Sequence, residues 1–248
     1  MLWITCFRLT WRRLVLLTAA GVLLLLAISE GQRYYWARET EEVIEAWSWA
    51  VAGRVIVIDP GHGGVDGGAV GKTGVTEKEL NLQVARRLGR LLSEAGAAVI
   101  LTREKDEDLA DPGTEGLLER KRQDLMRRVA LVRDSKADLL ISIHVNSFPS
   151  SRWWGAQTFY WRESEEGRKL AEAIQEELVR VLGNNRRKAK GEVFYLLETV
   201  DVPAVMVEMG FISNPREEQL LQDAVYQEKI ARAIYGGVVR YFARAAGR

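Results

Sequence analysis

From Arg54 onward, the chain alternates short apolar runs with longer segments whose apolar residues recur at helical spacing. The segment 77–95, for example, repeats leucine or valine every three or four residues until Gly96. The runs that predict strands are 55–58, 97–102, 139–144, 156–161, 193–197 and 204–207. The segments that predict helices are 77–95, 119–135, 164–182 and the stretch from 215 onward, whereas 105–116 predicts a loop. Strands that alternate with helices predict a single α/β domain over residues 54–248, with a mostly parallel or mixed sheet flanked by helices.

The first fifty residues have a different pattern. Residues 14–28 form an uncharged apolar run, and Arg8, Arg12 and Arg13 precede it. The run is short for a membrane span, which needs about 20 residues, but positive charge before it predicts that the remainder of the chain is exported. We therefore expect residues 1–30 to form an apolar helix that serves as a signal-anchor in the membrane or as a cleaved signal peptide. Residues 31–53 are polar and rich in tryptophan and glutamate, and we expect them to be a linker.

Charge and composition exclude several classes of protein. The net charge is +1, so the chain lacks the basic field that binds nucleic acid. The single cysteine, Cys6, precedes the apolar run, so the domain can form neither an internal disulfide nor a cysteine metal cluster. Gly71-Lys72-Thr73 resembles the end of a phosphate-binding loop, but Asp66 stands where that loop requires glycine. The sequence therefore points away from nucleotide, nucleic-acid and thiol chemistry.

The chain has only two histidines, and each follows a predicted strand. His62 and His144 both open into loops of small or polar residues. Because the carboxyl ends of strands line the ligand crevice of an open α/β sheet, both side chains should lie where chemistry takes place. Two imidazoles and one carboxylate make a catalytic zinc site with a position left for water. The alternative interpretation is that each histidine caps its strand through a hydrogen bond.

Three glutamates are candidates for the remaining roles. Glu77 and Glu79 open the helix predicted after His62, and spacing alone does not decide which is the third metal ligand. A glutamate in this position can instead complement the positive N-terminus of the helix. Glu208 follows the buried run 204–207, where an unpaired charge is costly, and this position suits a general base near the metal. A structural ion pair is the alternative for Glu208.

Four segments carry a resemblance to a known family. They are Asp59-Pro60-Gly61-His62-Gly63-Gly64, Glu77-Lys78 leading to Asn81-Leu82, Ser142-Ile143-His144-Val145-Asn146, and residues 203–214 with the sequence PAVMVEMGFISN. In this order they resemble the zinc N-acetylmuramoyl-L-alanine amidases, or amidase type 3 family, over about Arg54 to Tyr226. The resemblance implies that Zn²⁺ is bound by His62, Glu77 and His144 and that Glu208 is the catalytic acid/base. It further implies hydrolysis of the amide bond between N-acetylmuramic acid and L-alanine in peptidoglycan.

Within this family the chain is similar to the germination-specific spore-cortex amidases. The similarity includes the single N-terminal apolar segment, the charged segment 106–119 and the stretches 155–160 and 187–190. It implies a role in cortex maturation, in which a partner deacetylase leads on to muramic δ-lactam. We also expect Asp59 to orient a ligand and Asn146 to contact substrate. The basic run 186–190 is either a solvated loop or an attraction for an anionic glycopeptide.

Two other functions compete with this prediction. A zinc peptidase or deacetylase that acts on the cell wall would use similar ligands. A wall-binding module that has lost activity would share the fold, but the intact ligand set and Glu208 count against it.

Overall fold

The computed structural model describes residues 11–183 and 185–246, and the chain divides between Ala46 and Trp47. The first part contains the helix α1 (Trp11–Ala46), which runs without a break through the predicted boundary at residue 30. Among the described residues, no helix is both long enough and apolar enough to cross a membrane. Cys6 and Arg8 lie outside the described residues. The division at residue 30 and the choice between a signal-anchor and a signal peptide therefore stay predictions.

The part that begins at Trp47 is built on a six-stranded sheet with the order β2-β1-β3-β6-β4-β5. The strands are β1 (Val55–Pro60), β2 (Ala98–Leu101), β3 (Leu139–Asn146), β4 (Gln157–Trp161), β5 (Lys190–Glu192) and β6 (Ala204–Phe211). Strands β2, β1, β3 and β6 are parallel, β4 is antiparallel to β6, and β5 is parallel to β4. The predicted α/β fold with a mixed sheet is confirmed. The carboxyl ends of β1, β3 and β6 consequently meet at one edge of the sheet.

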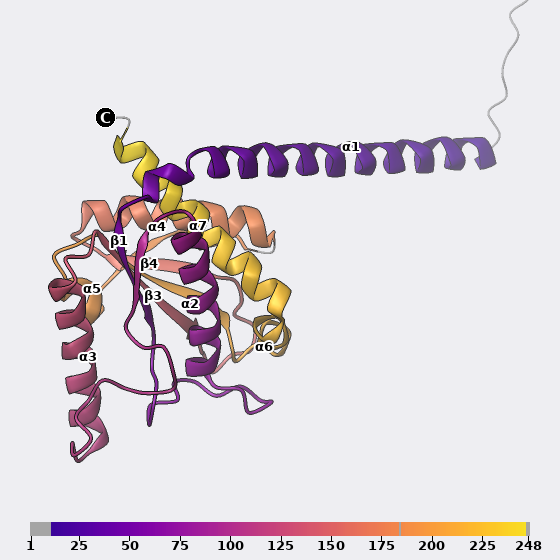
Figure 1. The fold of residues 1–248 in the computed structure, drawn as a ribbon. Helices are drawn as coiled ribbons and strands as arrows, with labels where there is room; N and C mark the ends of the chain where they lie inside the picture. The colour runs from indigo at the N-terminus through magenta and orange to yellow at the C-terminus, as the bar shows by residue number, and fades with distance from the viewer. Residues whose placement is uncertain (1–10, 184, 247–248) are drawn as a thin grey trace, which may run out of the picture. The chain divides into compact units, whose positions relative to one another are not determined.

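Helices cover both faces of this sheet (Figure 1). They are α2 (Glu77–Glu94), α3 (Leu117–Asp134), α4 (Glu165–Leu182), α5 (Tyr195–Thr199), α6 (Pro215–Gln222) and α7 (Ala224–Ala246), with a short 3₁₀ helix η1 (Ser48–Val51) before β1. Helices α3 and α5 lie on one face, and α2, α4 and α7 pack together on the other. Because side chains alternate along a strand, Ile58 lies beneath α2 whereas Val57 joins the apolar cluster beneath α3 and α5.

Two strand predictions differ from the structure. The run 193–197 is not a strand, because β5 ends at Glu192 and the one-turn helix α5 follows. Its residues Leu196 and Leu197 are buried in the core, which a short apolar run can achieve as either helix or strand. Strand β6 continues beyond the predicted end at 207 to Phe211, so Glu208 lies inside a strand. The predicted loop 105–116 contains no helix or strand.

Candidate metal centre

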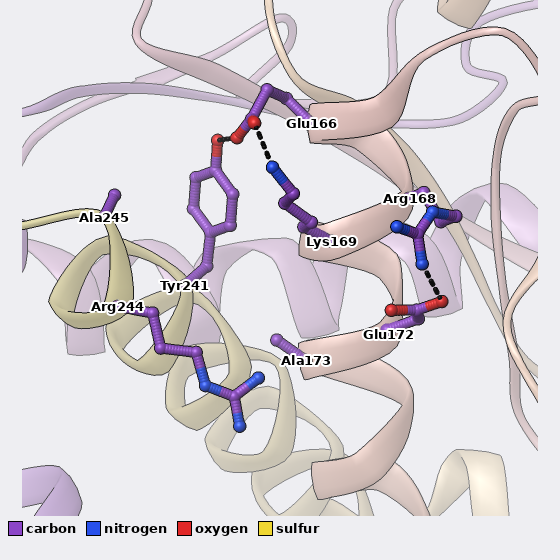
Figure 2. A pocket seen from close by; sticks show the side chains of 8 residues that line it. All are labelled: Glu166, Arg168, Lys169, Glu172, Ala173, Tyr241, Arg244 and Ala245. Atoms are coloured by element: carbon purple, nitrogen blue, oxygen red, sulfur yellow. Dashed lines mark hydrogen bonds and ion pairs between the residues drawn. The ribbon is translucent and has the colours of Figure 1, made fainter. Parts of the chain in front are cut away.

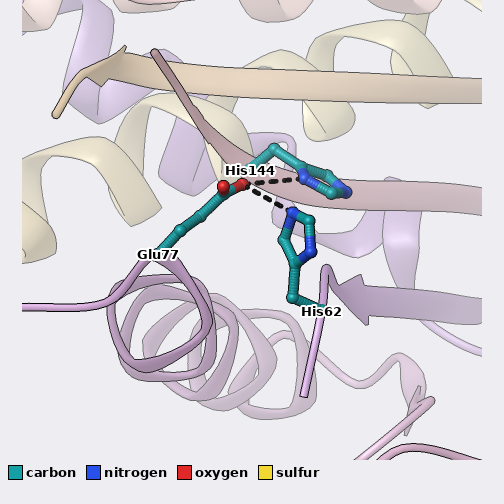
Figure 3. Close-up of side chains that lie close together, drawn as sticks. All are labelled: His62, Glu77 and His144. Atoms are coloured by element: carbon teal, nitrogen blue, oxygen red, sulfur yellow. Dashed lines mark hydrogen bonds and ion pairs between the residues drawn. The ribbon is translucent and has the colours of Figure 1, made fainter. Parts of the chain in front are cut away.

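Three predicted residues lie together at the carboxyl edge of the sheet (Figure 3). The Oε1 atom of Glu77 is 3.2 Å from Nε2 of His62 and 2.9 Å from Nδ1 of His144. The two imidazole rings are edge to face with their centroids 5.0 Å apart. One nitrogen from each ring and one carboxylate oxygen lie within 4.8 Å of one another. This cluster can hold a metal ion.

His62 reaches this position through an unusual backbone conformation. Its φ is +63°, in the left-handed region that side chains with a Cβ rarely adopt. Such a conformation persists only where the surrounding structure enforces it. Arg128 Nη2 donates to the carbonyl of His62 at 2.8 Å, and Arg103 Nη2 donates to the carbonyl of Gly61 at 3.1 Å. Both arginines are fully buried, so they hold the turn after β1 from inside the protein.

The predicted role of Asp59 takes a different form in the structure. The Asp59 carboxylate is buried and accepts hydrogen bonds from Arg128 at 2.6 Å, Thr102 at 2.7 Å and Ser142 at 2.7 Å. Burial opposes its ionisation, but the Arg128 charge and the two hydroxyl groups together hold the pKa of Asp59 below its usual value. Asp59 therefore acts on His62 through Arg128, which also donates to the His62 carbonyl.

Asp66 is a part of the site that the sequence interpretation did not identify. Its Oδ2 atom is 2.9 Å from Nδ1 of His62, on the opposite side of the ring from Glu77. Burial alone would lower the pKa of His62, but Glu77 and Asp66 together raise it above the usual value. A carboxylate on the second nitrogen of a metal-binding imidazole fixes its tautomer and ring orientation. The four-residue separation from His62 was the available signal for this role.

The first turn of α2 separates the two candidate glutamates. Glu77 is buried, and its Oε1 atom also accepts from the backbone N–H of Val145 at 3.0 Å. Burial disfavours the charge on Glu77, but the two histidines outweigh this cost and hold its pKa well below the usual range. Glu79 instead accepts from the N–H of Thr76 at 3.2 Å and so caps the helix. Only Glu77 therefore lies beside the histidines.

Two glycines allow these side chains to approach one another. A Cβ at Gly61 would overlap the imidazole of His144. Gly68 has a φ of +65°, and a Cβ there would lie 2.6 Å from Oε2 of Glu77 and 2.8 Å from the His62 ring. A side chain at either position would push the donor atoms apart.

Glu208 lies opposite His144 in the sheet, where the two residues are paired across β3 and β6. Its Oε2 atom is buried, and it has no hydrogen-bond partner among the described residues. Burial raises the pKa of Glu208 to about 7, and the charge of Glu77 adds to this effect while the two histidines oppose it. A carboxyl group with this pKa can both accept and donate a proton near neutral pH.

A cavity of about 170 Å³ opens beside the cluster. His62 and His144 line it together with Lys121 and Leu125 of α3 and Tyr195 of α5. Lys121 Nζ is 3.3 Å from Oδ2 of Asp66, so α3 places a cation at the mouth of the site. The cavity has room for a substrate group next to the donor atoms.

A different pocket, of about 270 Å³, lies between α4 and α7 (Figure 2). Several of its polar groups are paired with one another: Tyr241 donates to Glu166 at 2.9 Å, and Arg168 donates to Glu172 at 2.8 Å. Next to Tyr241 in α7, the ring of Phe242 lies under Arg54, which precedes β1. This pocket is therefore at the amino end of β1, away from the two histidines.

Asn146 ends β3, and its backbone carbonyl accepts from the N–H of Ile212 at 2.9 Å. Its predicted contact with substrate stays a prediction.

The sequence profile of the N-acetylmuramoyl-L-alanine amidase family, Amidase_3, matches residues 56–240. The chain belongs to this family. The matched segment includes His62, Glu77, His144 and Glu208 and contains all of the sheet except Val55. The amidase therefore carries its candidate metal centre within the family domain.

Known relatives and solved structures support this assignment. A germination-specific N-acetylmuramoyl-L-alanine amidase of Bacillus subtilis is 50% identical over 197 residues, which cover 79% of this chain and 83% of the relative. The amidase LytC of the same species is 37% identical over 194 residues, covering 77% of this chain and 36% of LytC. The CwlD amidase from Clostridioides difficile, solved in complex with the GerS lipoprotein, superposes with a TM-score of 0.76 at 39% identity and covers 77% of this chain and 100% of CwlD. The chain is thus a peptidoglycan amidase, close to the germination-specific enzyme.

Proposed function

We propose that this amidase is zinc-dependent and that His62, Glu77 and His144 hold the ion. Two imidazoles and a carboxylate are a donor set found in catalytic zinc sites, and these donor atoms already lie within 4.8 Å of one another. Zinc bound there would supply Lewis-acid chemistry, which acidifies a water molecule and polarises the scissile carbonyl. Asp66 and Val145 orient two of the three side chains, so the donors are arranged before any ion binds.

The observation that carries the mechanism is the buried Oε2 atom of Glu208, which has no hydrogen-bond partner in the part of the chain that the structure describes. Burial of an oxygen without a hydrogen bond is costly, and such an atom is suited to a partner that arrives with substrate and water. Because the pKa of Glu208 is raised to about 7, its carboxylate can take a proton from water and pass it to the leaving amine. Lys121 at the mouth of the cavity provides a positive charge for a carboxylate of the substrate.

The bond that we propose is cleaved joins the lactyl carbonyl of N-acetylmuramic acid to L-alanine. The 50% identity to a germination-specific amidase supports a role in the spore cortex, where muramic δ-lactam would then require a partner deacetylase. Peptidoglycan lies outside the cytoplasmic membrane, and we therefore propose that the chain is exported. In this proposal residues 1–30 direct export as a signal-anchor or a signal peptide.

Exchange of each glutamate for glutamine separates the two roles. Glu208→Gln keeps the size of the side chain but cannot accept a proton, so hydrolysis should fall by roughly two to four orders of magnitude. Zinc content should stay near one per chain, because the three ligands are intact. Glu77→Gln should instead weaken zinc binding, since a neutral amide is a poorer donor to a dication than a carboxylate. Glu79→Gln is the matched control, because the Glu79 side chain caps α2 through the N–H of Thr76 and does not contact the histidines.

The measurements are zinc content by atomic absorption and release of stem peptide from purified peptidoglycan. Loss of zinc from Glu208→Gln with full retention in Glu77→Gln would show that the two roles are exchanged. Full activity of zinc-loaded Glu208→Gln would place the base elsewhere.

A further inference from the structure

The segment between β3 and β4 carries an unusual group of exposed aromatic side chains. Phe148, Trp153 and Trp154 are 51%, 48% and 46% exposed, respectively. The two tryptophans line a groove of about 530 Å³, which we call the Trp153 groove. Its lining residues are Arg152, Trp153, Trp154, Asn185, Arg186 and Arg187. Large aromatic side chains gathered at a surface groove are typical of a binding site.

The base of the Trp153 groove is fixed by buried polar contacts. Arg187 donates to the carbonyl of Trp154 at 2.8 Å, and its guanidinium lies 4.7 Å from the ring centroid of Phe211. The buried side chain of Asn185 donates to Ala156 and accepts from the N–H of Arg187 at 3.0 Å. A groove held in this way is preformed, so a ligand does not have to order it.

The groove also carries exposed positive charge on two arginines. Arg152 and Arg186 are exposed, and within residues 11–183 and 185–246 neither forms an ion pair with a carboxylate. The guanidinium of Arg152 donates to the hydroxyl of Ser150 at 3.4 Å. Two guanidinium groups beside two indoles therefore suit a ligand that has both an apolar face and an anionic group.

The Trp153 groove lies next to the candidate catalytic glutamate. Gln157, at the start of β4, is paired with Glu208 across the sheet. The Oε1 atom of Gln157 accepts from Nη1 of Arg187 at 2.9 Å. Gln157 thus connects Glu208 to the base of the groove. A polymer whose reacting bond is at Glu208 can extend over the tryptophans.

We propose that the Trp153 groove binds the glycan strand of peptidoglycan at a muramic acid whose peptide has already been removed. This inference rests on the proposed function, because amide hydrolysis adds OH to the lactyl carbonyl and a proton to the amine of L-alanine. The glycan therefore keeps a free lactyl carboxylate. The flat C–H faces of pyranose rings pack on Trp153 and Trp154, and Arg152 and Arg186 pair with the carboxylate. The enzyme thereby retains a processed strand while the next muramoyl amide enters the cleft.

The test measures binding of the full chain to peptide-free glycan strands with free lactyl carboxylates. The variants are Trp153→Ala/Trp154→Ala and Arg152→Ala/Arg186→Ala. The matched controls are Trp49→Ala, which removes another exposed tryptophan, and Arg133→Ala, which removes another exposed arginine. Each groove variant should lose about tenfold or more in affinity, as expected when aromatic and arginine contacts are removed from a binding surface, whereas the controls should bind like the parent chain.

A second set of strands, with the carboxylates converted to methyl amides, tests the charge. The parent chain should bind these neutral strands as weakly as the arginine variant binds the charged strands, and the arginine variant should not distinguish the two. The thermal unfolding midpoint and zinc content check that each variant is folded.

Equal affinity of the parent chain and the tryptophan variant for charged strands would overturn the proposal. If the groove variants bind the strands like the parent chain but no longer bind a protein partner, the proposal is also overturned, and the groove is assigned to that protein. Because strand binding needs no hydrolysis, the two failures are distinguishable: a chain that binds strands as described but releases no peptide would refute the proposed function, and only the binding of strands by the groove would stand.

Discussion

At the scale of single residues, the geometry of the centre depends on the second nitrogen of His62. Nδ1 of His62 is held by Asp66, which leaves Nε2 directed toward Glu77. His144 uses its Nδ1 atom toward the same carboxylate. The two imidazoles thus present different nitrogens to Glu77. His62 also has a second carboxylate partner, Asp66. Because of this asymmetry, we expect removal of the Asp66 carboxylate to weaken metal binding.

Asp66→Asn should lower zinc affinity by about 10–100-fold, the usual effect of removing a carboxylate that orients a histidine ligand. The amide no longer fixes the tautomer of His62 or raises its electron density. Competition with a chromogenic chelator measures this change. Asp111→Asn, which alters an exposed carboxylate paired with Arg127, is the control and should keep the parent affinity. Equal affinity for zinc in both variants would remove Asp66 from the site.

At the scale of elements, the turn between β1 and α2 is held by a buried ion pair from α3. Arg128 is paired with Asp59 at 2.6 Å and with Asp124 at 2.9 Å, and it also donates to the carbonyls of Pro60 and His62. Helix α3 therefore holds the left-handed conformation of His62 from the face of the sheet on which it packs. The stability of the domain and the shape of the site depend on the same side chain.

Arg128→Met should lower the free energy of unfolding by about 3–5 kcal/mol at pH 7, because it leaves the buried Asp59 carboxylate without its cation. Adding Asp59→Asn should recover part of this loss, because the uncompensated charge is gone. Denaturant unfolding monitored by tryptophan fluorescence measures both values. Arg133→Met, on the exposed side of α3, is the control. Equal destabilisation in the single and double variants would contradict this account of the pair.

The pH dependence of this contribution follows from the sign of the Asp59 shift. The folded-state pKa of Asp59 lies below its usual value of 3.8, so the folded state binds the proton less tightly than the unfolded state. The stabilisation is fully present above about pH 4 and is lost as the pH falls through the folded-state pKa. Between neutral and acid pH, the free energy of unfolding of the parent chain should therefore fall more steeply than that of Asp59→Asn, as denaturant unfolding at a series of pH values measures.

At the scale of the whole molecule, the catalytic unit begins at Trp47 and holds every residue of the candidate centre. The sheet, its helices and the Trp153 groove all belong to this unit. The helix α1 contributes none of the donor atoms. Chemistry and export should consequently be separable.

A chain of residues 47–248 should bind zinc and release stem peptide from purified peptidoglycan at about the rate of the full chain, because the domain has its own core. Produced in cells, it should stay in the cytoplasm, whereas a reporter fused after Arg248 of the full chain should be active only outside the membrane. Enzyme assays and fractionation measure the two results. Export of the chain of residues 47–248, or a folded but inactive form of it, would contradict the separation of export from catalysis.

The sequence by itself determined the α/β class, most of the strands and helices, and the four candidate residues. Apolar periodicity and short motifs are local signals, and both are visible without a structure. Local signals did not decide whether the apolar run 193–197 is a helix or a strand, and in the fold it leads into α5. They also did not show that β6 extends past Glu208 to Phe211.

Only the tertiary structure decided which side chains surround the centre. Asp66 points to His62 because the turn after β1 is left-handed, and that turn is held by Arg103 and Arg128 from distant segments. The Trp153 groove forms where the segment after β3 meets the segment before β5. Contacts between residues far apart in the chain leave no periodic pattern in the sequence, because they depend on strand order and on the packing of α3 and α4 against the sheet.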